Sequence, residues 1–172
     1  MCSGGRFNRD KGITGVGDAL RTMPESAALL LVGEVDTTAP PAGDALARLK
    51  ADPRVHFAGF QRDVRPFIVA SDVLVLPSYR EGFPNVVLQA LSLSRPVIVT
   101  DVSGANEITV AGDNGWIVPV GDADALHRAM RDAIDSNADD LQRMGQRGRS
   151  RVASRHERAV YLQHLRDFYD SL

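Results

Sequence analysis

The sequence predicts an α/β fold, a Rossmann-like doubly wound sheet of about six parallel strands with helices on both faces. Three observations lead to this prediction. Short apolar runs rich in Val, Ile and Leu recur along the 172 residues, amphipathic segments separate them, and turn residues close several of them. Such runs are typical of parallel strands buried on both faces, and their alternation with helices favours right-handed crossovers.

Six segments have the strand pattern. The predicted strands are residues 1–4, 28–32, 55–58, 72–76, 96–100 and 115–118. Gly33, Gly59 and Pro77 directly follow three of them, as turn residues do at strand ends. His56 lies inside one apolar run, so we expect it to be a structural residue and not a metal ligand.

Helical patterns occupy the intervals between the strands. The predicted helices are residues 11–22, 43–51, 63–70, 85–94, 122–136, 138–148 and 157–170. The clearest pattern is the fifth, where Asp122 suits an N-cap position and Leu126, Met130 and Ile134 follow at four-residue spacing. We treat residues 1–172 as one domain, since nothing in the sequence resembles an interdomain linker.

Composition excludes several classes of function. The net charge of −2, from 20 basic and 22 acidic residues, argues against a nucleic-acid partner. The lone Cys2 excludes an internal disulfide and fits a cytoplasmic location. No apolar run approaches the roughly 18 residues of a membrane span. The histidines have no metal-binding spacing, so we expect neither a metal nor another cofactor.

The turn after the fourth apolar run contains Glu81, Gly82, Phe83, Pro84 and Asn85. In open α/β sheets, ligands bind beyond the carboxyl ends of the strands. Gly82 allows close backbone approach, Pro84 suits a first helical turn, and the free N–H groups of that turn attract phosphate. The Glu81 carboxylate can accept hydrogen bonds from two vicinal hydroxyls. This segment therefore suits a phosphorylated, polyhydroxylated ligand. The alternative interpretation is an ordinary strand-to-helix turn with Glu81 on a solvated rim.

Other turns at this edge supply further candidates. Gly5, Arg6 and Lys11 follow the first strand, and both cations suit phosphate, although the loop is neither a Walker A nor a Gly-x-Gly-x-x-Gly sequence. Gln89, one helical turn beyond Asn85, either leans back toward the strand ends or lies exposed on its helix.

Gly104 and Glu107 follow the fifth strand. Gly104 fits a tight turn facing a ligand. Glu107 is either a third acceptor or a carboxylate at a helix start, and the second interpretation is favoured.

Together these segments resemble the C-terminal domain of family 4 glycosyltransferases (glycosyltransferases group 1), which have the GT-B fold. The similar segments, which cover nearly the whole chain, are Gly5-Arg6 with Lys11-Gly12, residues 31–33, 55–59, 70–73, 76–88 and 95–98, Gly104 with Glu107, and Asn114-Gly115. The run 76–88 is the most specific of them. It is most similar to bacterial enzymes that build surface polysaccharides from UDP-activated sugars.

The resemblance implies a role for each site residue. Arg6 and Lys11 would bind the donor diphosphate and stabilise charge on the leaving group, without a metal. Glu81 would hold hydroxyls of the transferred sugar. The implied donor-binding residues are Gly5, Gly59, Phe60, Gln61, Gly82, Phe83, Pro84, Asn85, Gln89, Gly104 and Glu107. Of these, the turn from Gly59 to Gln61 would lie against the nucleobase.

Gln89 departs from the family pattern, which has Glu, seven residues, then Glu. The second Glu normally accepts hydrogen bonds from the ribose hydroxyls. Glutamine keeps one acceptor oxygen but loses the charge. Because charge-assisted hydrogen bonds are stronger than neutral ones, we expect donor binding to be weaker by about 1 kcal/mol.

The resemblance also implies a retaining transferase whose acceptor-binding N-terminal domain lies outside this sequence, in cis or in trans. We therefore expect the chain alone to bind the nucleotide sugar but to transfer little. Residues 157–172 would cross to that domain, and the full enzyme would sit at the inner face of the membrane. The alternatives are a stand-alone binding module that acts with a separate partner chain, and a GT-B sugar-nucleotide epimerase domain.

Overall fold

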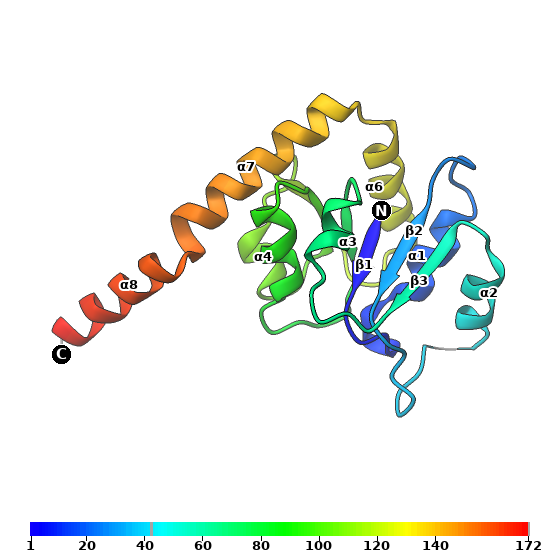
Figure 1. The fold of residues 1–172 in the computed structure, drawn as a ribbon, viewed down its shortest axis with the longest axis horizontal. Coiled ribbons are helices and arrows are strands. Elements are labelled where there is room, and N and C mark those ends of the chain that lie inside the picture. Colours follow the sequence, from blue (N-terminus) through cyan, green and yellow to red (C-terminus); the bar gives the residue numbers. More distant parts are fainter. Residues whose placement is uncertain (42, 172) are drawn as a thin grey trace.

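One parallel sheet with the strand order β3-β2-β1-β4-β5-β6 organises the chain (Figure 1). The strands are β1 (Cys2–Gly4), β2 (Leu29–Val32), β3 (Val55–Gly59), β4 (Leu74–Leu76), β5 (Val97–Thr100) and β6 (Gly115–Val118). The computed structural model describes residues 1–41 and 43–171, and among these the side chains of residues 158, 159, 161 and 164 are outside the description. The predicted doubly wound sheet is confirmed, with its switch point between β1 and β4.

Helices cover both faces of this sheet. They are η1 (Arg9–Lys11), α1 (Ile13–Leu20), α2 (Ala45–Ala51), α3 (Arg65–Val69), α4 (Asn85–Ser92), α5 (Ala105–Ile108), α6 (Ala123–Asp135), α7 (Ala138–His156) and α8 (Arg158–Asp170). Asp122 caps α6 as predicted, since its side chain accepts a hydrogen bond from the N–H of Ala125 at 2.8 Å.

Two helix predictions need correction, and one helix was missed. The helix predicted at 11–22 is divided, because Gly12 has a left-handed conformation (φ 63°) that separates the 3-10 turn η1 from α1. The helix predicted at 138–148 continues to His156. Its second half is mostly polar and exposed, so hydrophobic periodicity does not reveal it. The short helix α5 was not predicted.

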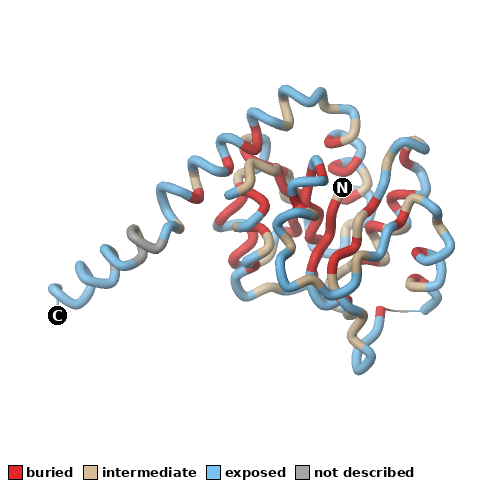
Figure 2. The backbone as a smooth tube through the Cα atoms, viewed as in Figure 1, coloured by how far each residue is buried: buried red, intermediate tan, exposed pale blue. Residues whose placement is uncertain are grey.

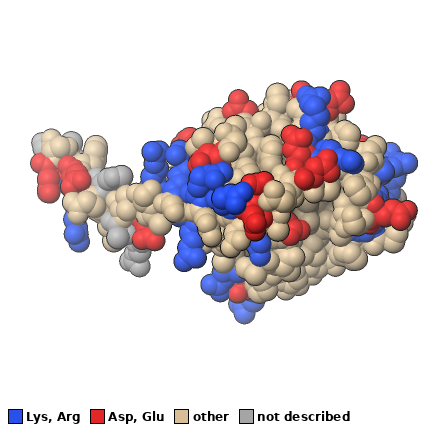
Figure 3. Space-filling model, turned by 90° about the horizontal axis from the view of Figure 1, so that it is seen from above, with Lys and Arg blue, Asp and Glu red and all other residues tan. Residues whose placement is uncertain are grey.

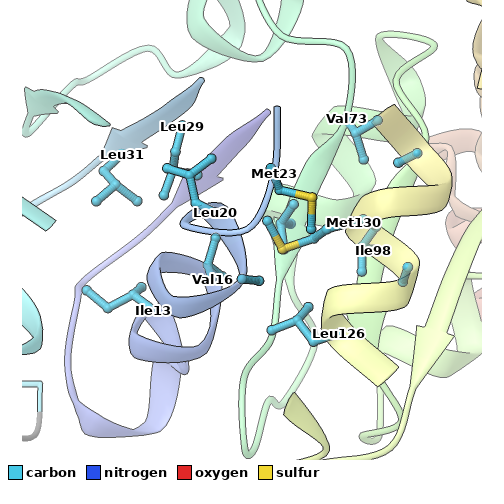
Figure 4. Close-up of a cluster of buried hydrophobic side chains, with 14 of the residues drawn as sticks. Ile13, Val16, Leu20, Met23, Leu29, Leu31, Val73, Ile98, Leu126 and Met130 are labelled. Atoms are coloured by element: carbon cyan, nitrogen blue, oxygen red, sulfur yellow. The ribbon is translucent and has the colours of Figure 1, made fainter. Parts of the chain in front are cut away.

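Alternation of side chains along the strands builds two cores. In β4, Val75 packs into the cluster between the sheet and helices α1 and α6, which Figure 4 shows. Its neighbours Leu74 and Leu76 pack on the opposite face, with α4 and α5. The same alternation holds in β5, where Ile98 and Val99 point to different clusters. This period of two explains why the apolar runs are continuous.

The strand β3 departs from the prediction that every run is buried on both faces. It is an edge strand, and its side chain Phe57 is 39% exposed. His56 is exposed there, so the prediction of a structural histidine inside the sheet is wrong. Edge strands lose one neighbour and part of their helical cover, which the apolar composition of the run does not reveal.

The inner strand β1 contrasts with this edge. There, burial raises the pKa of the Cys2 thiol to about 11.

The last helix projects from the body of the protein (Figures 1 and 2). It exposes Leu162, Leu165, Phe168 and Tyr169. Tyr161 belongs to the same helix, but its side chain lies outside the described residues. Within residues 1–41 and 43–171, no helix combines the length and hydropathy needed to cross a membrane.

The helix α7 packs closely on the segment after α4. A Cβ added at Gly145 would lie 2.0 Å from the carbonyl oxygen of Ser94. In an exposed helix, alanine in place of glycine stabilises by up to about 1 kcal/mol. At Gly145 the added methyl group must displace the backbone of Ser94. The cost of this steric overlap is larger than the gain in helix propensity.

We expect Gly145→Ala to lower the free energy of unfolding by about 2 kcal/mol, the usual cost of overpacking a close contact. Gln146→Ala, at the next and exposed position, is the control and should change it by less than about 0.5 kcal/mol. Urea unfolding followed by circular dichroism measures both. A stabilised Gly145→Ala protein would contradict this packing.

Candidate functional site

The loops after β1 and β4 meet at the switch point of the sheet. A Cβ at Gly12 would lie 2.1 Å from the carbonyl oxygen of Pro77, so these backbones are in contact. The N–H of Tyr79 donates to the carbonyl oxygen of Asp10 at 2.7 Å. The Arg80 guanidinium also donates to the Asp10 carboxylate, with Nε 2.8 Å from Oδ2. Asp10 therefore joins the two loops, a role that the sequence did not indicate.

Lys11 and Glu81 form the central contact of this site. The Lys11 ammonium donates to Oε1 of Glu81, across 70 positions of sequence. Their side chains are 24% and 12% exposed, so both are largely shielded from solvent. A cation that suits phosphate and a carboxylate that suits hydroxyls are thus in direct contact.

Arg6 lies apart from this pair. Its side chain is 77% exposed, and its guanidinium is 4.0 Å from Oδ2 of Asp36. Hydrogen bonds from the Thr38 hydroxyl and backbone lower the pKa of Asp36, and the charge of Arg6 adds a smaller effect. The structure therefore brings Lys11 and Glu81 together but leaves Arg6 on the rim. Diphosphate binding by Arg6 stays a prediction.

The loop of residues 77–84, which we call the donor loop, leads into α4. Gly82, Phe83 and Asn85 are exposed, whereas Pro84 is buried. Pro84 is the N-cap residue, one position before the first helical turn where the sequence placed it. Within the described residues, the backbone N–H groups of Asn85 and Val86 donate no hydrogen bond. They remain available for an anion at the positive end of the helix dipole.

Gly104 holds the turn after β5 against this loop. With φ 77°, a Cβ there would lie 2.1 Å from the carbonyl oxygen of Gly82. Oε1 of Glu107 accepts a hydrogen bond from the N–H of Gly104 at 3.2 Å. Glu107 thus engages the start of α5, in agreement with the favoured interpretation of a helix-start carboxylate. Its contact with a donor stays a prediction.

The remaining predicted residues lie along the same edge of the sheet. The Gly59 carbonyl oxygen accepts a hydrogen bond from the N–H of Gly33 at 2.8 Å. The backbone of Gly5 also packs closely against Gly33. Phe60 is 65% exposed, and Gln61 Nε2 donates to the carbonyl oxygen of Ala58 at 2.7 Å. The exposed ring of Phe60 is able to stack on another flat ring.

The helix α4 carries Gln89 one turn beyond Asn85. The Gln89 side chain is exposed.

One contact at the site comes from α7. The rings of Phe83 and His156 lie 5.7 Å apart and tilted by 53°. Burial lowers the pKa of His156, and the charges of Arg151 and Arg155 lower it further. Figure 3 shows basic side chains gathered where α7 leads toward α8. Sequence spacing contains no signal for this contact, because 73 positions separate the two rings.

A hollow lies beside the pair of loops. It has a volume of about 450 Å³, between the starts of α1 and α6. Its rim includes Arg9, Asp10, Tyr79 and Asp122. This cavity was not predicted, because it depends on how two helices that are distant in sequence pack.

The described residues contain no group of three or more His, Cys, Asp or Glu side chains that could hold a metal ion. That the reaction needs no cofactor stays a prediction.

Comparison with known proteins identifies relatives of the chain. A family model described as glycosyl transferases group 1 matches residues 2–136. The lipopolysaccharide core biosynthesis glycosyltransferase LpsE of Rhizobium meliloti is 34% identical over 142 residues, which are 80% of this chain and 40% of LpsE. The capsular polysaccharide biosynthesis glycosyltransferase CapM of Staphylococcus aureus is 30% identical over 171 residues, 97% of this chain and 44% of CapM. The chain spans less than half the length of either relative.

Solved structures share the fold. Anabaena HepE in complex with UDP superposes with a TM-score of 0.87 at 22% identity, over 99% of this chain and 49% of HepE. The C-terminal domain of the group 1 protein LpcC from Francisella tularensis superposes with a TM-score of 0.75 at 24% identity, over 91% of this chain and 86% of that domain. The predicted half of a GT-B fold is confirmed.

We expect Gly104→Ala to destabilise the protein far more than Gly112→Ala. Both glycines have nearly the same φ, 77° and 75°, so each substitution costs about 1 kcal/mol of backbone strain. Nothing lies within 4 Å of a Cβ at Gly112, whereas Gly104 faces the Gly82 carbonyl. Overpacking adds about 2 kcal/mol at Gly104. Chemical denaturation measures both losses, and equal losses would show that the two loops separate freely.

Proposed function

Because the chain belongs to the group 1 glycosyltransferase family, we propose that it is the donor-binding part of a retaining transferase. The transferase moves a sugar from a UDP-sugar to a glycan or lipid-linked acceptor in bacterial surface polysaccharide biosynthesis. The names of LpsE and CapM support this pathway, and the UDP bound to HepE supports the nucleotide.

The observation that carries the proposal is the meeting of Lys11 and Glu81 at the switch point. Lys11 lies where its ammonium can neutralise charge that develops on the departing diphosphate. Glu81 accepts hydrogen bonds from vicinal hydroxyls of the sugar. The free N–H groups of Asn85 and Val86 bind the phosphate oxygens at the start of α4.

The rest of the edge accommodates the nucleoside. The exposed ring of Phe60 stacks on the base, and the nearby Gln61 borders it. Gln89, exposed on α4, accepts a hydrogen bond from the ribose. Arg6 reaches the diphosphate by leaving Asp36, from which it is already 4.0 Å away.

A second domain completes the active site in this proposal. Alignments with relatives of about twice the length cover almost the whole of this chain, including α8. The exposed residues Leu162, Leu165 and Phe168 supply the apolar surface that such a domain would bury. The isolated chain binds the donor but supplies only part of the transition-state environment, so transfer is slow.

Thermal unfolding with added nucleotides tests the proposal. Because UDP binds only the folded state, we expect it to raise the midpoint, by a stabilisation of about 2.7 kcal/mol at one hundred times its Kd. Lys11→Gln should remove most of the shift, and Lys50→Gln, an exposed lysine of α2, should retain it. If UDP, GDP and ADP and their sugar conjugates all leave the midpoint unchanged, the proposal fails.

Restoring a carboxylate at position 89 should strengthen donor binding. We expect Gln89→Glu to improve the Kd for UDP about fivefold, because a charge-assisted hydrogen bond to the ribose replaces a neutral one. Gln146→Glu makes the same charge change at an exposed site on α7 and should leave the Kd unaltered. Calorimetric titration measures both, and an unchanged Kd for Gln89→Glu would contradict a ribose contact.

A further inference from the structure

Without a ligand, the two charged groups of the donor site bind each other. The Lys11 ammonium donates to Glu81, and both side chains are largely shielded from solvent. Among the side chains that the structure describes, which leave out those of residues 158 and 164, no other basic group lies within ion-pair distance of the Glu81 carboxylate. The neighbouring Arg80 is held by Asp10, and Arg6 faces Asp36.

This arrangement limits how an anion can use Lys11. A phosphate that draws the ammonium away leaves Glu81 without its cation and beside a second negative charge. A shielded carboxylate with no partner is destabilised, because little solvent replaces the lost contact. The rearranged site is stable only if the ligand also satisfies Glu81.

We propose that the Lys11–Glu81 pair makes the site select an intact sugar nucleotide over the nucleoside diphosphate that transfer leaves behind. The inference rests on the proposed function and deepens it. Sugar hydroxyls donate hydrogen bonds to Glu81 as the diphosphate takes Lys11, so both partners of the broken pair are satisfied. A nucleoside diphosphate satisfies only Lys11, and the orphaned carboxylate weakens its binding and favours its release.

The surrounding structure favours this coupling. A Cβ at Gly5 would lie 3.8 Å from Cε of Lys11, so the lysine stem runs along the loop after β1. Asp10, next to Lys11, is bonded to the backbone of Tyr79 and to Arg80, next to Glu81. The loops that carry the two charges are therefore fastened together. A ligand can separate the side chains, but it does not easily move the loops apart to relieve the exposed charge.

The experiment is calorimetric titration of the whole chain with UDP and with UDP-glucose, UDP-galactose and UDP-N-acetylglucosamine. We expect Glu81→Gln to increase the affinity for UDP about tenfold, because Lys11 is then free. For the UDP-sugar that binds the unaltered chain best, the same variant should lower the affinity or leave it unchanged, because the amide is a poorer acceptor. Asp113→Asn removes a carboxylate paired with Arg147 on the α7 side, 2.7 Å away, and should change neither affinity.

A double-mutant cycle isolates the coupling. Lys11→Gln should lower the affinity for UDP more in the Glu81→Gln background than in the unaltered chain. Only in that background is the Lys11 ammonium unpaired before UDP binds. If Glu81→Gln leaves UDP binding unchanged or weaker in a folded protein, the pair does not restrain Lys11 and the inference is overturned. If the unaltered chain binds neither UDP nor any of the three UDP-sugars, the proposed function itself fails.

Discussion

The close approach of the loops after β1 and β4 is the constraint on which the site depends. Parallel strands at a switch point send their chains to opposite faces of the sheet, which opens a crevice between the loops. Here Gly12 brings its loop into backbone contact with Pro77, and Asp10 is bonded to Tyr79 and Arg80. A side chain at position 12 would push the loops apart. Lys11 reaches Glu81 because this contact keeps the crevice narrow.

The close approach of the two loops also determines how strongly solvent screens the charges of the site. An exposed ion pair contributes little, since water and salt screen both charges. Lys11 and Glu81 are shielded, so losing either partner changes how strongly the other binds a ligand. By contrast, the Arg6 side chain is 77% exposed, so solvent screens its charge beside Asp36, 4.0 Å away. Arg6 and Lys11, two cations of the loop after β1, therefore differ in energetic importance because only Lys11 is shielded.

Much of the fold follows from local pattern, because buried parallel strands and capped helices leave periodic signals. Asp122 and its helix illustrate this. The exposure of β3 does not follow, since edge position depends on strand order. At the site, the resemblance identified Lys11 and Glu81 as donor-binding residues, but their contact and the role of Asp10 depend on the spacing of the loops. The contact of Phe83 with His156 depends on the length of α7, which polar residues conceal.

That last contact bears on how a second domain would complete the site. The helix α7 is fixed to the body by the close packing of Gly145, and its final residue, His156, lies against Phe83 of the donor loop. Beyond it, Glu157 has an extended backbone, and α8 follows with Leu162, Leu165, Phe168 and Tyr169 exposed. The helix that packs on the body thus ends beside the donor loop. In the proposed two-domain enzyme, a domain that buries the apolar face of α8 would be anchored next to Phe83, as an active site shared between two domains requires.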